Sequence, residues 1–455
     1  MAPTYDPHTG LNVPVVAVYL VFLVIFLDTI GATISTPALP YYAAKFGCTN
    51  AQIGYLFGAW SLTSTCFAPI LGRLADVVGR RTVLLMSLVG AGAAAIAQGV
   101  APNYSVLLLA RGFSGIWAAV GSTAQVYLAD SCSPAMLPIY MARLSSVPGL
   151  AMIFGPGLGG GLSKFGLNVP IIVDGCVSLF SSILVLVYMP ESVAWLASQS
   201  KEKSEDKNPT ETSPLHAAEG GATVDTVVEE PPKPPDTHHK TLALLCLSQM
   251  FNGITFSTIV SMLAVSLAAK LDFDALRVGY TFVGLAVVMV FTAVWLTPVA
   301  QKKLGIEQAA VLATVVTAVA LVWFALADTV LTVLLALAVS RCAQSLRGAS
   351  FGTIVTQATT IQTRGTTLAR VQLFLNGGRL IGPLVAGNLA NFDPERAPWY
   401  LAAAASFVSA ALLQATVKIQ PAQTAPAGHG RHVEDLDQLM KYAAVVQAEI
   451  ARHNI

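Results

Sequence analysis

Charged residues are scarce in this chain: they make up 11% of its 455 residues, against about 25% in a typical soluble domain. Hydrophobic residues account for 54%. Such a chain cannot cover a water-facing surface with polar groups, so most of its surface must face lipid. The net charge is only +1, which argues against a nucleic-acid partner, because phosphate binding relies on an excess of Lys and Arg.

Patterns typical of metal sites and enzymes are also missing. The six cysteines stand far apart, with no metal-ligand spacing, and we interpret them as packing residues. There is no phosphate-binding loop and no convincing pair of nucleophile and base. We therefore expect no cofactor, no metal and no enzymatic activity. No Lys or Arg precedes Lys45, so the positive region of a cleaved signal peptide is absent.

Twelve apolar runs are long enough to cross a bilayer, whose ~30 Å core needs about 20 helical residues. The runs are 14–36, 53–74, 82–101, 105–128, 138–162 and 169–190, then 241–268, 277–300, 307–326, 329–355, 367–390 and 398–418. Residues 192–240 are charged and then proline-rich, a composition that predicts a disordered linker. The predicted units are an N-terminal tail at 1–13, a six-helix bundle at 14–191, the linker, a second six-helix bundle at 241–418 and a tail at 419–455.

Lys and Arg gather in one set of loops, which should be cytosolic, together with both termini. Apolar residues at spacings of three and four predict a short amphipathic helix at 433–452, either solvent-exposed or bound to a partner. The sequence leaves open whether the membrane is the plasma membrane or that of a vacuole or vesicle.

The two halves resemble each other in sequence. Gly155-Pro156 matches Gly382-Pro383 at an offset of 227, and 141–144 matches 368–371 at the same offset. Related bundles imply a parallel pseudo-repeat around a midplane cavity whose access alternates. The predicted fold class is therefore an all-α integral membrane protein, with twelve transmembrane helices in two pseudo-symmetric six-helix bundles.

A motif at 72–81 reads G-R-L-A-D-V-V-G-R-R and is placed in the loop between the second and third runs. Its glycines allow a tight turn, and its aspartate can accept hydrogen bonds from the backbone N–H groups of a helix N-terminus. One of its arginines can form an ion pair with Asp130. We interpret the cluster as a latch that closes the cytosolic side in the outward-facing state; the alternative is that its charges only mark that side. The predicted gate consists of Gly72, Asp76, Gly79, Arg80, Arg81 and Asp130.

This motif resembles the signature of the major facilitator superfamily, G-x-L-a-D-x-x-G-R-R/K, at the same place in the chain. The resemblance extends over roughly 14–418. It implies a monomeric transporter that works without a cofactor, with a small-molecule substrate, protons and the lipid bilayer as its partners.

Asp28 lies deep in the first run, where a carboxylate costs several kcal/mol unless it is paired, hydrated or protonated. It can exchange a proton, or it can be a structural partner of Arg111 in the fourth run. The stretch from Asp28 to Pro40 resembles the first helix of tetracycline:proton antiporters and vesicular amine transporters. Arg111 resembles the family's fourth-helix arginine, which is linked to proton coupling; the alternative is that it snorkels to the outer interface.

The segment 155–160, Gly-Pro-Gly-Leu-Gly-Gly, resembles the end of the family's antiporter signature. The match is partial, because Ala142 and Ala151 replace two earlier glycines of that signature. A similar pattern in the eleventh run means that the motif can indicate exchange or only a hinge. The predicted hinge residues are Gly155, Pro156, Gly159, Gly160, Gly382 and Pro383.

Two departures argue against tetracycline itself as the substrate: Ala94 stands where those antiporters carry an acid, and Met289 lies near the place of their histidine. Asp28 is interpreted as the only well-buried carboxylate, with Asp174 near the outer end of the sixth run. Other polar side chains can line the cavity or bond between helices. The predicted cavity residues are Gln125, Gln249, Asn252, Asn376 and Arg379.

The leading interpretation is a secondary active transporter that expels a small amphipathic or cationic solute in exchange for a proton on Asp28. A facilitator or a proton symporter for a metabolite is the first alternative, because the scaffold does not encode direction. The second alternative is a membrane receptor or partner-binding protein that transports nothing.

Overall fold

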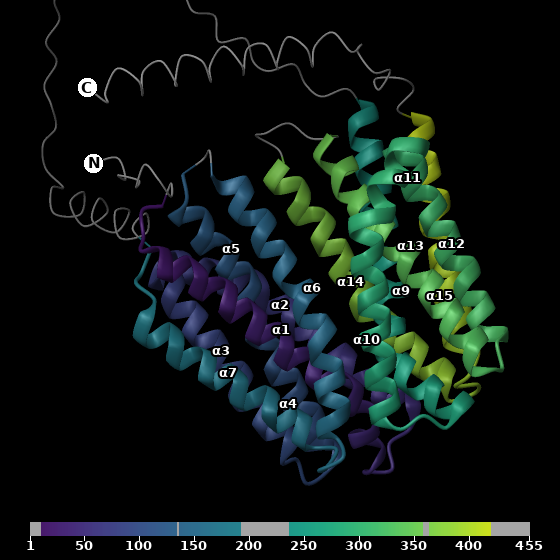
Figure 1. The fold of residues 1–455 in the computed structure, drawn as a ribbon, viewed down its shortest axis with the longest axis horizontal. Helices are drawn as coiled ribbons and strands as arrows, with labels where there is room; N and C mark the ends of the chain where they lie inside the picture. The colour runs from purple at the N-terminus through teal and green to yellow at the C-terminus, as the bar shows by residue number, and fades with distance from the viewer. Residues whose placement is uncertain (1–10, 134–135, 193–235, 358–363, 420–455) are drawn as a thin grey trace, which may run out of the picture.

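The computed structural model describes residues 11–133, 136–192, 236–357 and 364–419. Residues 193–235 of the predicted linker, 420–455 with the predicted amphipathic helix, and 1–10 lie outside these residues, whereas 236–240, also predicted as linker, begin a helix. The described part is helical almost throughout (Figure 1). A single β-bridge joins Leu11 to Cys132 and holds the start of the described chain against the end of a later helix.

The helices fall into two groups in chain order. The first group is α1 (Val15–Ala44), α2 (Asn50–Val78), α3 (Arg80–Gly99), α4 (Tyr104–Ile116), α5 (Val120–Ser131), α6 (Leu137–Leu162) and α7 (Val169–Tyr188). The second group is α9 (Asp236–Leu271), α10 (Ala275–Phe291), a π-helix (Thr292–Leu296), α11 (Thr297–Leu304), α12 (Ile306–Leu326), α13 (Val330–Gln357), α14 (Arg364–Ala390) and α15 (Ala397–Ile419).

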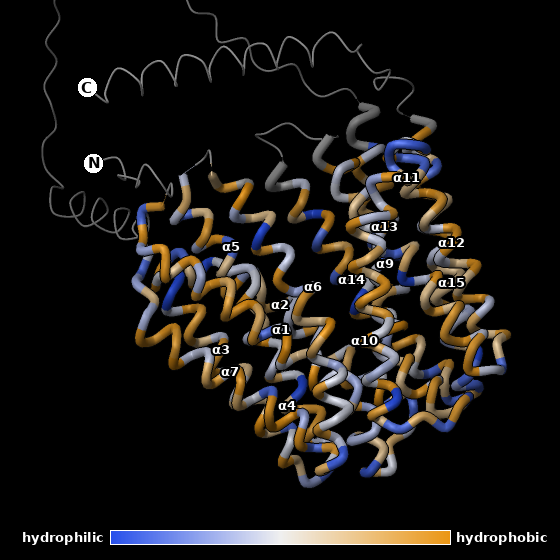
Figure 2. The backbone as a smooth tube through the Cα atoms, viewed as in Figure 1, coloured by the Kyte–Doolittle hydropathy of each residue, from blue (hydrophilic) through white to orange (hydrophobic). Residues whose placement is uncertain are grey.

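Nine helices of the described part are long and apolar enough to cross a membrane, when α4 with α5 and α10 with α11 are each taken together. The remaining long helices are α2, α6 and α14, each of at least 26 residues. They pack at the contact between the halves, α14 against α2 and α6 against α10. Much of the tube in Figure 2 has the orange colour of hydrophobic residues, as expected of helices in lipid.

Two of the predicted runs contain irregular turns, and one local prediction needs correction. The fourth run is broken between α4 and α5 by a turn at 117–119. The eighth contains the π-helix, because Pro298 has no N–H to donate to the preceding turn. The motif at 72–81 is mostly helical: α2 continues to Val78, and only Gly79, with φ 101°, separates it from α3.

Each group has its own apolar core. In the first, Val21, Leu88 and Leu128 are buried together, and in the second, Leu321 and Trp399 belong to one cluster. Figure 1 shows the two groups side by side, which we call the N-half and the C-half. This arrangement matches the predicted all-α architecture of two helical bundles.

The two halves meet closely at one end, which we call the closed end. The phenol of Tyr41 donates to the backbone carbonyl of Phe273 at 2.6 Å, and the Asn50 amide donates to that of Ala390 at 2.8 Å. Figure 1 shows the helices spreading apart toward the opposite end, where α1 begins and α15 ends. We call this the open end; the structure therefore has one sealed side.

Candidate functional site

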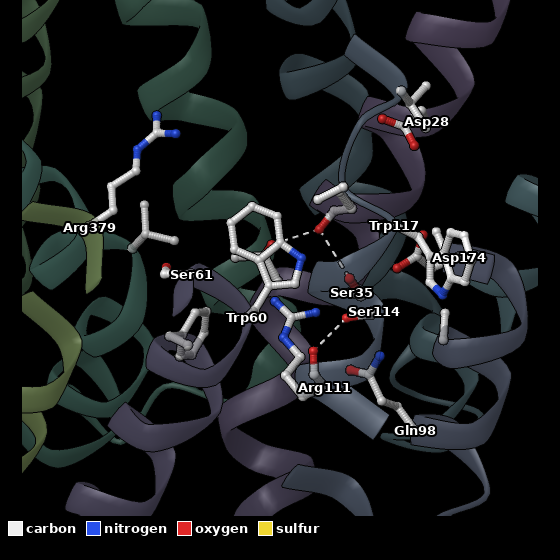
Figure 3. A pocket seen from close by; sticks show the side chains of 18 of the residues that line it. Asp28, Ser35, Trp60, Ser61, Gln98, Arg111, Ser114, Trp117, Asp174 and Arg379 are labelled. Atoms are coloured by element: carbon white, nitrogen blue, oxygen red, sulfur yellow. Dashed lines mark hydrogen bonds between the residues drawn. The ribbon is translucent and has the colours of Figure 1, made fainter. Parts of the chain in front are cut away.

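A cavity of about 370 Å³ lies between the halves. It is lined mainly by α1, α2, α3, α4 and α7, with α9 and α14 contributing from the C-half. Its polar and aromatic lining includes Asp28, Ser35, Trp60, Ser61, Gln98, Arg111, Ser114, Trp117, Asp174 and Arg379 (Figure 3). The cavity therefore combines charged, polar and aromatic side chains, as small-molecule sites commonly do.

Asp28 and Asp174 both line this cavity, on α1 and α7. Asp174 interacts electrostatically with Asp28 and with Arg111. The interpretation of Asp28 as the only well-buried carboxylate is therefore wrong. The reason lies in Gly31, since a Cβ there would collide with the Asp174 carboxylate. Because Gly31 has no side chain, Asp174 can pack beside α1. This contact joins two helices that are far apart in the sequence, so neither run alone predicts it.

Arg111 lies across the lower part of the cavity in Figure 3. Its guanidinium carbon is 5.8 Å from the centre of the Phe57 ring and 5.9 Å from that of Trp60, distances at which a cation is attracted to the aromatic face. Its Nε has no hydrogen-bond partner within the described protein, and neither has the indole nitrogen of Trp117. The lining of the cavity therefore contains two buried donors that have no partner among the described residues.

The predicted cavity residues have different positions. Arg379 lines the cavity, and its guanidinium lies 5.1 Å from the centre of the Phe256 ring. Gln249 instead accepts a 3.1 Å hydrogen bond from Arg347, within the C-half. Three further predicted residues stand outside the lining of this cavity; they are Gln125, Asn252 and Asn376.

A second cavity of about 200 Å³ is lined by Met152, Leu285, Met289 and other apolar side chains, together with Arg341. Thr36, Phe256 and Val260 line both cavities, so the two are adjacent. Sequence reasoning missed Arg341 and also the buried Arg347. The sequence does carry a signal for them, because any arginine inside a membrane run is a candidate for function.

The predicted gate residues cluster at the open end of the N-half. Arg80 pairs with Asp130 at 2.9 Å and with Asp76 at 2.9 Å. The backbone N–H of Arg81 donates to Glu191, whose carboxylate lies where a Cβ at Gly79 would be. Glu191 was missed because it stands at the edge of the apolar run. These contacts are all internal to the N-half, and a Cβ on Gly72 would meet open space.

The hinge glycines make two equivalent sets of contacts. Gly155 of α6 packs on α1 at Thr33, and Gly382 of α14 packs on α9 at Ser257. Gly159 likewise lies against the carbonyl of Ile34. Pro383 lines the first cavity, and Pro156 lines the second. The internal repeat of the sequence is therefore visible as a repeat of helix crossings.

Nearer the closed end, glycine pairs join the halves. A Cβ on Gly279 would lie 3.0 Å from the Cα of Gly160, and a Cβ on Gly387 would lie 3.0 Å from that of Gly54. Gly160 and Gly387 occupy equivalent places in the two halves. Such short separations leave no room for side chains, so small residues allow the backbones to meet.

The fold and the cavity define a multi-pass helical membrane protein with a solute-sized site between two bundles. The Major Facilitator Superfamily description matches this chain over residues 21–231 and 245–446, and the chain belongs to that family. Its membership and its relatives indicate a transporter rather than an enzyme.

Relatives in sequence include two drug-resistance proteins. The class G tetracycline resistance protein of Vibrio anguillarum is 31% identical over 176 residues, which are 38% of this chain and 45% of that protein. The quinolone resistance protein NorA of Staphylococcus aureus is 26% identical over 177 residues, 38% of this chain and 46% of that protein. These matches span about half the length of each relative.

Among solved structures, the fold resembles a bacterial homolog of the human lysosomal transporter Spinster in an inward-facing, occupied conformation. The TM-score is 0.72 at 14% identity, over 89% of this chain and 98% of that one. The human organic anion transporter MFSD10 (TETRAN) gives a TM-score of 0.60 at 18% identity, over 88% of this chain and 99% of that one. At these identities the likeness concerns the fold alone.

Proposed function

We propose that this protein is a secondary active transporter that moves a small amphipathic solute through the central cavity by alternating access. The leading mode is proton-coupled efflux, in which Asp28 exchanges a proton as the solute binds and leaves. The observation that carries the proposal is the cavity itself, where two carboxylates and Arg111 face a solute-sized space between two bundles. The drug-resistance relatives support efflux as the direction.

The carboxylates and Arg111 form a unit suited to proton exchange. Asp174 interacts with Arg111, so its ionised form has a cation beside it. Asp28 faces the cavity and has Asp174 as a negative neighbour. A like charge nearby disfavours ionisation, and water in the cavity gives a proton a route to the carboxylate. Asp28 is therefore the better proton acceptor, and Asp174 the better partner of the arginine.

Alternating access needs one end to open as the other closes. The glycine pairs would seal the closed end, and the cluster around Arg80 would seal the open end in the opposite state. We place the open end in the cytosol, because its loops carry most of the Lys and Arg. On this placement both termini are cytosolic and the present state faces inward.

A second candidate is symport of a proton with an acidic metabolite. The expectation of a cationic solute rests on Asp28, whereas three arginines line the two cavities together with only two carboxylates. An acidic solute would be held by those arginines. It would favour the protonated form of Asp28, so that proton and solute bind together rather than in turn.

The test uses purified full-length protein in liposomes that contain a pH-sensitive dye. Matched cationic, neutral and acidic amphipathic compounds are added, with a proton gradient in either direction. We expect solute-dependent proton flux that is lost in Asp28→Asn. The control is Asp328→Asn, because that carboxylate is 73% exposed and lies in the loop between α12 and α13.

The outcomes separate the candidates. Protons moving against the solute support efflux by exchange, and protons moving with it support symport. Solute uptake that occurs without proton flux and is unchanged in Asp28→Asn contradicts the role of Asp28 and leaves a facilitator. If no compound crosses the membrane in any condition, the transport proposal itself fails.

A further inference from the structure

The charges that line the two cavities do not balance. Asp28 and Asp174 face the N-half side, and Asp174 already interacts with Arg111. Arg379 and Arg341 come from the C-half. No carboxylate of the described residues forms a salt bridge with either of these two arginines. An arginine that stays charged in a membrane needs a counter-ion or water, and these two lining charges have no anion paired with them among the described residues.

The two arginines line adjacent cavities that share the side chain of Phe256. Arg379 stands over Phe256, which lines both cavities, and Arg341 lines the second cavity beyond it. Arg341 is 7% exposed, and within the described part of the chain it donates to the side chain of Gln344, one turn away on α13, at 3.1 Å. The Nε of Arg379 and the amide nitrogen of Gln344 have no hydrogen-bond partner among the described residues. Buried donors without partners are costly unless a ligand or water accepts from them.

A third buried arginine shows what a structural arginine looks like in this half. Arg347 is 3% exposed and lines neither cavity. Its terminal nitrogens donate to Gln249 at 3.1 Å and to Ser409 at 3.2 Å, although its Nε, like that of Arg379, has no hydrogen-bond partner among the described residues. It therefore joins α13 to α9 and α15, whereas Arg379 has no such partner among the described residues and faces open volume. The difference argues against a purely structural role for Arg379.

We infer that the C-half holds a subsite for the acidic group of the solute, formed by Arg379 and Arg341 around Phe256. The ligand class is an amphipathic acid, with a carboxylate, sulfonate or phosphate held by the guanidinium groups and an apolar body in the second cavity. The apolar side chains around Arg341, such as Leu285 and Met289, suit such a body. Arginine binds these acidic groups through paired, charge-assisted hydrogen bonds. This inference rests on the proposed transport function, since it names the solute of the same cavity.

Figure 3 shows why the subsite is distinct from the proton-exchanging pair. Arg379 lies on one side of the view, and Asp28 and Asp174 lie on the other, with Trp60 between them. An acidic group held by Arg379, with its apolar body in the second cavity, therefore leaves Asp28 and Asp174 free to exchange a proton.

The experiment measures binding to the full-length protein in nanodiscs of zwitterionic lipid by isothermal titration calorimetry. The probes are naphthalene-2-carboxylate and the neutral, equally shaped naphthalene-2-carboxamide. We expect Arg379→Gln to weaken carboxylate binding by about tenfold to a hundredfold, the range for a lost charge-assisted hydrogen bond, and to change amide binding by less than about twofold. Arg379→Lys should retain part of the preference, because it keeps the charge.

The matched control is Arg370→Gln, which removes the same charge from an exposed position on the same helix. It should leave both affinities unchanged. Equal binding of the two probes to the unmodified protein overturns the inference, as does a variant at Arg379 that weakens both probes alike. If adding phosphatidylglycerol to the nanodisc displaces the carboxylate probe, a lipid headgroup fills the subsite and the soluble acid is the wrong occupant.

Failure of this inference is distinguishable from failure of the transport proposal. Liposome flux of neutral or cationic compounds but not of the acid would leave transport intact and remove the acidic subsite. Selective binding of the acid without flux of any compound would keep the subsite and remove transport. Arg341→Gln is the second variant, and it should show the same selective loss of carboxylate binding if Arg379→Gln does not fold.

Discussion

Gly54 of α2 and Gly387 of α14 meet so closely that a Cβ on Gly387 would lie 3.0 Å from the Cα of Gly54. A second contact of the same kind joins Gly160 of α6, in the N-half, to Gly279 of α10, in the C-half. These two crossings place backbone against backbone at the closed end, where the sequence has no side chain to separate the helices. The seal of this end therefore depends on the size of single residues, which makes it easy to test.

Enlarging Gly279 should open the closed end. A leucine there has no room beside the backbone of α6, and overpacking of this kind costs typically about 1–3 kcal/mol. A free-energy change of about 1.4 kcal/mol shifts an equilibrium tenfold. The equilibrium constant for sealing the closed end should therefore fall by about tenfold to a hundredfold. Spin labels in the loops 45–49 and 391–396 should report a longer distance in Gly279→Leu.

The matched control is Gly284→Leu on the same helix, because a Cβ there meets nothing within 4 Å. It should leave the distance distribution unchanged. An unaltered distance in Gly279→Leu, in a protein that still folds in the membrane, would mean that these glycines do not set the seal. The same would follow if both leucine variants changed the distances equally.

Asp174 should be needed for coupling as well as Asp28. Asparagine at this site leaves Arg111 without its carboxylate neighbour and removes a negative charge beside Asp28. Proton uptake by Asp28 then becomes less favourable, because a neighbouring negative charge stabilises the protonated form. We expect the pH dependence of flux in Asp174→Asn to move toward lower pH, measured as flux at a fixed gradient over a series of internal and external pH values.

A second variant should move the Asp174 carboxylate without changing the charge of the protein. Gly31→Ala should displace the Asp174 carboxylate, since its Cβ would collide with that oxygen. We expect it to resemble Asp174→Asn in its pH profile. A normal profile in both variants would show that Asp174 takes no part in coupling and only lines the cavity.

The case of Asp174 shows how far the sequence could be used. Asp28, the motif at 72–81 and the repeat at 227 residues are local or periodic features, and each can be recognised without a structure. Asp174 looked peripheral because depth was judged along one helix. Its access to the cavity depends on a crossing with α1 at Gly31, and such crossings depend on packing between distant segments.

The sequence also does not show which polar side chains face the cavity. Gln249 and Arg379 both stand in membrane runs, and the sequence treats them alike. The structure distinguishes them, because Gln249 already bonds to Arg347 whereas Arg379 faces the cavity. Orientation around a helix follows from neighbouring helices, and a polar group satisfied by one of them carries no functional signal.

Breaking the Arg80–Asp130 pair should weaken the open-end cluster. Asp130→Asn removes the charge from a bond of 2.9 Å between groups that are 13% and 22% exposed. Removing one partner of a mostly buried pair costs about 3–5 kcal/mol at most, and less here because solvent still reaches both groups. We expect a lower unfolding temperature of the purified protein, measured by tryptophan fluorescence, and slower transport. Arg73→Gln, an exposed neighbour in the same motif, should change neither.

The sign of the pH effect on binding distinguishes an acidic solute from a cationic one. Asp28 and Asp174 become neutral as the pH falls, while Arg111, Arg379 and Arg341 stay charged. The lining therefore becomes more positive on acidification, so an acidic probe should bind more tightly at low pH and a cationic probe less tightly. Calorimetry with naphthalene-2-carboxylate and 2-naphthylmethylamine over a pH series measures both trends. Asp28→Asn should reduce both trends, because it removes one of the two titrating charges. Tighter binding of the amine at low pH would contradict the role given to the carboxylates.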